Sequence, residues 1–177
     1  MKPFSRIAAI AVIASTLFGT GYIARANHYP PQPFVEAQTI GLLRSVQSNG
    51  VHVVIDEPNR CKENIYGAAM ISADRQRQYL LICASNHGDN LDELGDTIRH
   101  EAIHVAQHCR ARREGYNQVL PLLPKHVEQL LFLAVQRYHM PLGLYSDEDR
   151  PAEAEARVGA RILNENQIAA IVERECS

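Results

Sequence analysis

Excess charge of one sign is missing from this chain of 177 residues. Its 18 lysines and arginines nearly balance its 20 aspartates and glutamates, for a net charge of −2 at pH 7. Nucleic-acid-binding domains generally carry a strongly basic surface, so we expect no nucleic-acid partner. Internal repeats and low-complexity tracts are also missing. With 46% apolar and 21% charged residues, the composition is ordinary for one globular domain.

An uninterrupted hydrophobic run long enough to span a membrane is missing too. The apolar stretch Ile7–Phe18 is followed by glycines, whereas a spanning helix needs about 20 mostly apolar residues. Lys2 and Arg6 precede this stretch, and Ala24-Arg25-Ala26 offers small residues at both positions of a cleavage site. A basic start, a short apolar centre and a small-residue end are typical of a secretory signal peptide.

Residues 1–26 are therefore predicted to be a signal peptide. Residues 27–177 would form a single exported domain, periplasmic or extracellular. The alternative is an uncleaved N-terminal anchor over residues 7–23. Only in that case does the sequence predict an association with a membrane.

The chain has four cysteines but no C-x-x-C pair, so neither a zinc ribbon nor a thioredoxin-like site is indicated. An even number of cysteines in an exported protein suggests two disulfides. Three pairings are possible from sequence alone. We favour Cys61 with Cys83, which would tie a loop to a nearby strand, and Cys109 with Cys176, which would fasten the C-terminus to a helix end. Four buried free thiols are the alternative.

Hydrophobic periodicity predicts an α+β domain in which strands come before most of the helices. A polar turn joins the second and third strands, which predicts a hairpin. The helix over 91–112 has Asn90 and Glu93 as a capping signal. The predicted elements are a helix over 34–46, strands over 51–56, 65–73 and 78–84, helices over 91–112 and 125–139, and one or two helices over 152–174, with Asp149 as a possible cap.

The stretch His100-Glu101-Ala102-Ile103-His104 lies inside that capped helix and has the pattern H-E-x-x-H. On an α-helix, residues four apart lie on one face, so His100 and His104 can direct ring nitrogens at one metal ion. Glu101 can then accept a proton from an activated water molecule. The alternative is an ordinary surface helix with solvated His and Glu side chains.

A catalytic zinc site has three protein ligands, so a further ligand is needed. His108 follows His104 by four residues, but three ligands over two turns of one straight helix cannot easily converge on a tetrahedral centre. The metzincin pattern would require Gly at Gln107 and His at Arg110. We therefore expect the third ligand from elsewhere in the chain, and place His108 at the surface or beside the ligands.

Downstream, Glu153-Ala154-Glu155-Ala156-Arg157 opens an alanine-rich helix that is suited to close packing. An H-E-x-x-H helix followed by a helix with E-x-x-A resembles the gluzincin-like zincin metallopeptidases. This resemblance covers mainly 91–112 and 151–163. It implies a zincin-like α+β fold with a small antiparallel sheet packed on the active-site helix and further C-terminal helices. It also implies Zn²⁺ as the cofactor and Glu153 as its third ligand, with Glu155 in reserve.

The chain departs from this family at Arg157, where many members carry an aspartate that supports a metal-binding histidine. Asp96, Asp147 and Asp149 are the candidates to replace it. Family members also align an extended peptide on an edge strand, for which either strand of the hairpin is available. The candidates for stabilising the oxyanion are Tyr145, His139 and Arg150.

The sequence thus predicts a zinc-dependent metallopeptidase that acts on peptide or protein substrates. His100, His104 and Glu153 would hold the metal, and Glu101 would be the general base. An exported, catalytically silent zinc-binding relative is the alternative. A helical interaction module without metal is a third hypothesis.

Overall fold

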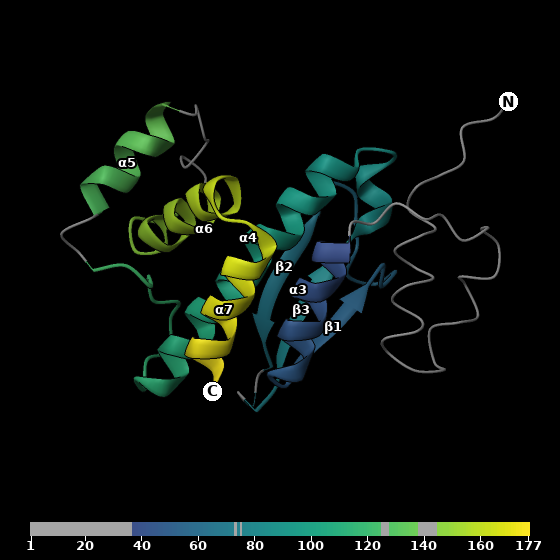
Figure 1. Ribbon diagram of the computed structural model, residues 1–177. Helices are drawn as coiled ribbons and strands as arrows, with labels where there is room; N and C mark the ends of the chain where they lie inside the picture. The colour runs from purple at the N-terminus through teal and green to yellow at the C-terminus, as the bar shows by residue number, and fades with distance from the viewer. Residues whose placement is uncertain (1–36, 73, 75, 125–127, 138–144) are drawn as a thin grey trace, which may run out of the picture.

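The computed structural model describes residues 37–72, 74, 76–124, 128–137 and 145–177. These residues form a small three-stranded sheet and five α-helices (Figure 1), which confirms the α+β class. The predicted signal peptide and anchor lie outside the described residues. Among the helices that are described, none has the length and apolar character needed to cross a membrane.

The predicted elements are present, mostly with shorter strands. The stretch predicted as one or two helices is two, because Leu163 is extended and the Asn164 side chain caps the second helix. The elements are α3 (Ala37–Ser48), β1 (Val51–Ile55), β2 (Gly67–Ile71), β3 (Gln78–Ile82), the short 3₁₀ helix η2 (Ala84–His87), α4 (Leu91–Arg113), α5 (Glu128–Arg137), α6 (Arg150–Ile162) and α7 (Glu165–Cys176).

The sheet is mixed, so the prediction of an antiparallel sheet is wrong. The strand order is β1-β3-β2, in which β1 and β3 are parallel and the predicted hairpin of β2 and β3 is antiparallel. The chain passes from β1 to the edge strand β2 before β3 returns between them. Because β2 reverses the chain direction and β3 reverses it again, β3 runs parallel to β1. Periodicity along one strand carries no information about this order.

Helix α4 is the central element, and it packs against the sheet and against helices α6 and α7 (Figure 1). The Asn90 side chain accepts a hydrogen bond from Glu93 N at its start, as the capping signal predicts. One side of α4 is apolar and buried, with Leu94, Ile98 and Val105 each at most 2% exposed. The two motif histidines are partly buried on the same helix. Burial of this apolar side therefore fixes the position and rotation of the helix that carries the two histidines.

Helix α6 approaches α4 closely because its contact face consists of small residues. A Cβ atom at Gly159 would lie 2.6 Å from Ile103 Cδ1, and Ala152 and Ala156 are almost fully buried. Arg99 on α4 also donates a 2.8 Å hydrogen bond to Ala160 O near the end of α6. This approach brings the first turn of α6 against the motif face of α4. Asp149 occupies the N-cap position of α6, as predicted, but its side chain accepts a hydrogen bond from Ser146 Oγ and makes no capping hydrogen bond with the helix.

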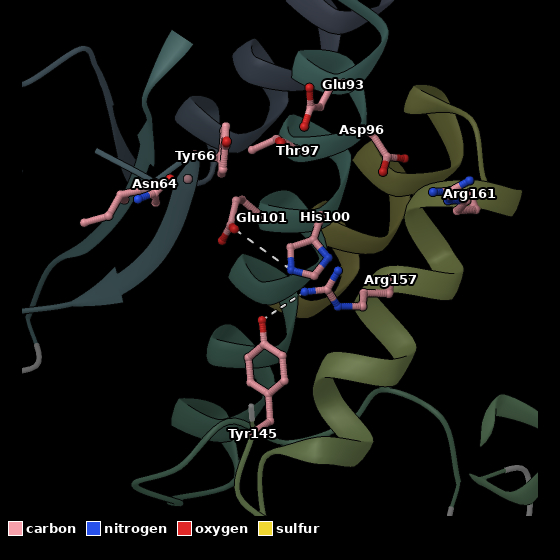
Figure 2. Close-up of a pocket in the computed structure, with 12 residues that line it drawn as sticks. Asn64, Tyr66, Glu93, Asp96, Thr97, His100, Glu101, Tyr145, Arg157 and Arg161 are labelled. Atoms are coloured by element: carbon pink, nitrogen blue, oxygen red, sulfur yellow. Dashed lines mark hydrogen bonds and ion pairs between the residues drawn. The ribbon is translucent and has the colours of Figure 1, made fainter. Parts of the chain in front are cut away.

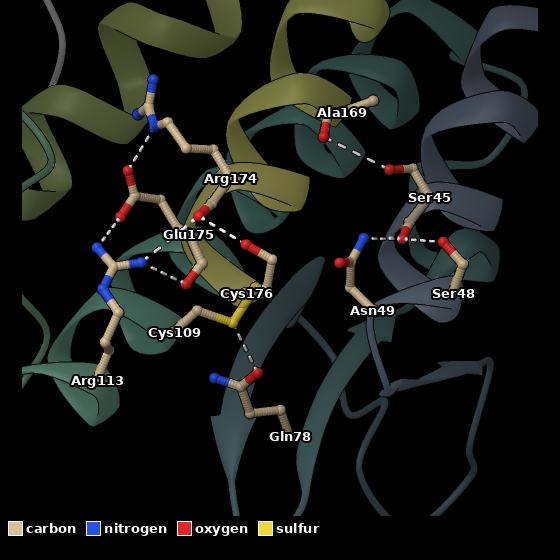
Figure 3. Close-up of a disulfide and its surroundings, with 11 residues drawn as sticks. Ser45, Ser48, Asn49, Gln78, Cys109, Arg113, Ala169, Arg174, Glu175 and Cys176 are labelled. Carbon is tan, nitrogen blue, oxygen red and sulfur yellow. Dashed lines mark hydrogen bonds and ion pairs between the residues drawn. A yellow bond between two sulfur atoms is a disulfide. The ribbon is translucent and has the colours of Figure 1, made fainter.

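Both predicted disulfides are present, and no described cysteine is free. Cys61–Cys83 ties the loop after β1 to the end of β3. Cys109–Cys176 joins α4 to the C-terminus of α7, beside the 2.7 Å ion pair of Arg113 with Glu175 (Figure 3). Two disulfides are typical of proteins from oxidising compartments.

Candidate metal centre

Three predicted ligands converge where α6 meets α4. His104 Nε2 lies 3.0 Å from Glu153 Oε2 and 3.1 Å from His100 Nε2. His100 Nε2 lies 3.5 Å from Glu153 Oε1. One ligand atom from each residue falls within 4.8 Å of the other two. Two histidines four residues apart and a glutamate at least 49 positions farther along the chain therefore present two nitrogens and a carboxylate to one point.

This spacing fits a zinc ion. Ligands about 2.0–2.1 Å from a tetrahedral ion are separated from one another by about 3.3 Å. His104 Nε2 lies at about this spacing from His100 Nε2 and from Glu153 Oε2, at 3.1 and 3.0 Å. The 3.5 Å separation of His100 Nε2 is from the other carboxylate oxygen, Oε1. Glu153 is 4% exposed, and its buried Oε1 is ion-paired with Arg157 Nε at 2.6 Å but accepts no hydrogen bond of good geometry from a described residue. Two imidazoles and a carboxylate are also a donor set found in catalytic zinc sites.

Gln107 orients one of the two histidines. Its side chain is fully buried, and its Nε2 donates to Ala152 O at 2.9 Å and to Glu155 Oε2 at 2.7 Å. Because both of these partners are acceptors, the amide oxygen must face His104 Nδ1, 2.7 Å away. His104 therefore carries a proton on Nδ1. In the neutral ring this leaves the lone pair of Nε2 directed at the cluster.

Glu155 supports Gln107 and does not join the ligands. Its carboxylate accepts from Gln107 Nε2 and from the backbone N–H groups of Leu122 and Leu123, each at 2.7 Å. On a helix, residues two positions apart point in nearly opposite directions. Glu153 consequently faces the histidines while Glu155 faces the loop, so the reserve ligand has a structural role.

The three clustered side chains have pKa values that are shifted in different directions. Burial and the positive charge of His104 lower the pKa of His100 to about 3. Burial opposes the charged form of His104, but the hydrogen bond with Glu153 and the nearby carboxylates outweigh it and raise the pKa of His104. Burial likewise opposes ionisation of Glu153, yet the two histidines and Arg157 lower its pKa to about 2. The carboxylate therefore stays ionised and available to a cation near neutral pH.

Glu101 is buried next to the cluster without belonging to it. Its Oε1 lies 4.0 Å from His100 Nε2, and the side chain is 10% exposed. Burial raises the pKa of Glu101 to about 7, although His104 and a hydrogen bond with the backbone of Ala69 act in the opposite direction. A carboxyl group whose pKa lies near neutral pH is suited to accept and return a proton.

The raised pKa of Glu101 also predicts a pH dependence of stability. Between pH 4.5 and about 7 the folded chain holds a proton on Glu101 that the unfolded chain has lost. The contribution of Glu101 to the stability of the metal-free protein therefore falls as pH rises through this window. Glu101→Gln should remove this loss, so that the variant gains about 2 kcal/mol over the wild type between pH 5 and pH 7.5. Chemical denaturation of both metal-free proteins measures the difference, and a gap that is independent of pH would contradict it.

Gly67 on β2 allows Glu101 to sit close to the sheet. A Cβ at this position would lie 2.8 Å from Glu101 Cγ and 2.9 Å from Thr97 Cγ2. We expect Gly67→Ala to displace the carboxylate and lower the rate of any reaction that depends on Glu101 by about 10-fold, with the metal ligands intact. Gly41→Ala on α3 is the matched control, because nothing lies within 4 Å of its added Cβ. Equal activity of the two variants would show that the close approach is unimportant.

A cavity of about 430 Å³ opens over His100 and Glu101 (Figure 2). Asn64 and Tyr66 lie on one side of it and α6 on the other, so the two helices and the start of β2 form its walls. Tyr145, one of the predicted oxyanion candidates, lines the cavity with its hydroxyl 3.0 Å from Arg157 Nη2.

The other residues considered from the sequence lie elsewhere. None of the predicted aspartates contacts the histidines: Asp96 pairs with Arg99 and Asp147 pairs with Arg150. His108 is partly buried one turn beyond His104 and outside the cluster. His139 falls outside the described residues.

Two residues of the site were missed in the sequence, although each left a signal. Gln107 follows His104 by three positions, and Arg157 follows Glu153 by four, which are the spacings at which helical side chains meet. Arg157 Nε lies 2.6 Å from Glu153 Oε1. Comparisons of this chain with known protein families, curated proteins and solved structures found no match.

Proposed function

We propose that this protein is a zinc-dependent metallopeptidase of the gluzincin-like zincin type. The observation that carries the proposal is the convergence of His100, His104 and Glu153 at zinc-ligand spacing beside the buried carboxyl of Glu101. A purely structural metal site has no use for a buried carboxyl group that is not a ligand. The cavity beside the cluster supplies space for a substrate.

The chain's own residues account for the proton transfers. When bound, zinc would supply Lewis acidity and acidify a water molecule. Glu101 would accept a proton from the attacking water and then deliver it to the leaving amine. Gln107 keeps His104 in the tautomer whose Nε2 can bind a metal. Arg157 is ion-paired with Glu153 Oε1, the carboxylate oxygen that does not face His104.

An edge strand is available for an extended substrate. At one end of the hairpin Cys83 N donates to Tyr66 O, and at the other end Ser72 N donates to Arg77 O. The hydrogen-bonding pattern of an antiparallel pair alternates along each strand, so every second residue of β2 directs its backbone groups away from β3. These residues are Gly67, Ala69 and Ile71. The backbone of Ala69 already bonds to Glu101 and His108, so Gly67 and Ile71 are the two that remain for a peptide. Because β3 is central, β2 is the hairpin strand that can pair with a peptide.

Export belongs to the same proposal. We infer that residues 1–26 are removed as a signal peptide and that the mature chain begins near Asn27. The two disulfides support an oxidising location. A catalytically silent, exported zinc-binding protein is the second candidate, because it would keep the same three ligands.

Metal analysis and a peptidase assay together test the proposal. The purified mature chain should hold one zinc ion and cleave unstructured peptides. A chelator should stop cleavage, and added zinc should restore it. His104→Ala should lose the zinc, whereas His108→Ala on the same helix should keep it. Zinc without cleavage would leave the silent zinc-binding protein, and the absence of zinc would favour the interaction module.

A further inference from the structure

The α6 wall of the cavity carries two arginines one turn apart, Arg157 and Arg161. Figure 2 shows the Arg157 guanidinium between the His100 ring and the Tyr145 hydroxyl. Arg161 lies farther along α6 and makes no hydrogen bond or ion pair within the described part of the chain. Both side chains thus place positive charge on one side of the candidate metal centre.

The Arg157 guanidinium has donors to spare. Its Nε lies 2.6 Å from Glu153 Oε1, and one Nη2 hydrogen is donated to Tyr145 Oη. A guanidinium has five N–H groups, so most of them remain for a ligand in the cavity. The Tyr145 ring also packs 5.7 Å from Arg157 Cζ and belongs to the apolar cluster between α5 and α6. This packing holds the guanidinium beside the reacting position.

The charge of the site leaves room for an anion. The carboxylates of Glu153 and Glu101 do not balance a divalent cation together with Arg157. Two further acidic residues, Glu93 and Asp96, line the cavity near the start of α4. Asp96 is paired with Arg99. The hydrogen bond from neutral Asn90 leaves the negative charge of Glu93 in place, and the positive charge of Arg161 on the same cavity offsets it.

We propose that the α6 wall selects substrates that carry a carboxylate near the scissile bond, with Arg157 as the residue that binds it. This inference rests on the proposed peptidase function and deepens it. A carboxylate matches the planar fork of an arginine and gains charge-assisted hydrogen bonds from it. In a peptide the group comes from an aspartate or glutamate side chain, or from the C-terminus.

Matched peptides test this selection and separate the two sources. One series carries Glu or Gln at each position that flanks the cleaved bond. A second ends in a free carboxylate or in an amide. We expect kcat/KM to favour the carboxylate form by about 10- to 100-fold in one of the series. Arg157→Met should bring the ratio to about 1, and Arg157→Lys, which keeps the charge but not the fork, should leave a few-fold preference.

Controls exclude loss of zinc, unfolding and a general loss of positive charge as causes of a changed ratio. Each variant is assayed with saturating zinc after its melting temperature has been checked. Arg112→Met removes one positive charge from an exposed part of α4, and it should leave the ratio unchanged. A wild-type ratio near 1, or a preference that survives unchanged in Arg157→Met, would overturn the inference.

Failure of the inference and failure of the proposed function give different results. If the wild type cleaves neutral and acidic peptides equally well and needs zinc, the peptidase stands and the carboxylate selection is wrong. If no peptide of either series is cleaved, the peptidase itself is wrong.

Discussion

Replacing Glu101 by glutamine is expected to slow peptide hydrolysis by about 10²–10⁴-fold while the chain still binds one zinc ion. Glutamine has nearly the same shape as glutamate, so it fits the space beside Gly67 and Thr97. It cannot take a proton from water, because its amide is not a base. Zinc should remain because Glu101 is not among the three converging ligands. Rates on a fluorogenic peptide and zinc content measured on the same sample give both quantities.

The matched control is Glu173→Gln on α7. Glu173 is exposed and remote from the cluster, so the change removes one carboxylate without touching the site and should leave hydrolysis unaffected. Hydrolysis by Glu101→Gln within a few-fold of the wild-type rate would exclude Glu101 as the general base. Loss of zinc in the variant would show instead that Glu101 acts as a ligand.

Replacing Gln107 by leucine is expected to weaken zinc binding by about 10- to 100-fold. The variant removes the acceptor that faces His104 Nδ1, so the neutral ring is free to place its proton on Nε2, where it blocks the metal. Leucine also leaves the Glu155 carboxylate and Ala152 O without the donor they share. Some loss of stability should therefore accompany the loss of affinity.

Affinity and tautomer can be measured separately. Competition with a chromophoric chelator gives the zinc affinity, and ¹⁵N NMR of the metal-free protein shows which nitrogen of His104 carries the proton. Gln136→Leu on the exposed side of α5 is the control for adding an apolar side chain. If Gln107→Leu binds zinc as tightly as the wild type and keeps the Nδ1 proton, the hydrogen bond from His104 to Gln107 does not prepare the ligand.

Much of the fold could be predicted from local sequence because it depends on local forces. The capping signal at Asn90 and the helical spacing of apolar residues place α4 within one residue of its observed end. The hairpin follows from two β-branched or apolar runs with a polar turn between them. The pairing of Cys109 with Cys176 was favoured because one cysteine lies near the end of the motif helix and the other at the chain end.

The strand order and the support of His104 could not be predicted in the same way. β3 lies between β1 and β2 because of the path taken by the loop that joins β1 to β2. The hydrophobic periodicity of a strand contains no information about that path. The chain also lacks the aspartate that the resemblance led us to seek. A neutral glutamine from the motif helix takes that role. Its spacing of three residues from His104 allows the contact but does not distinguish it from a surface glutamine.

The sequence by itself determined the helix that carries His100, Glu101 and His104, because i to i+4 spacing is a property of any α-helix. Only the tertiary structure decided that Glu153 and not Glu155 faces them. That choice depends on how α6 is rotated as it packs on α4 through Gly159 and its alanines. Rotation about a helix axis is set by the packing of two surfaces against each other, and no single segment of the sequence contains both.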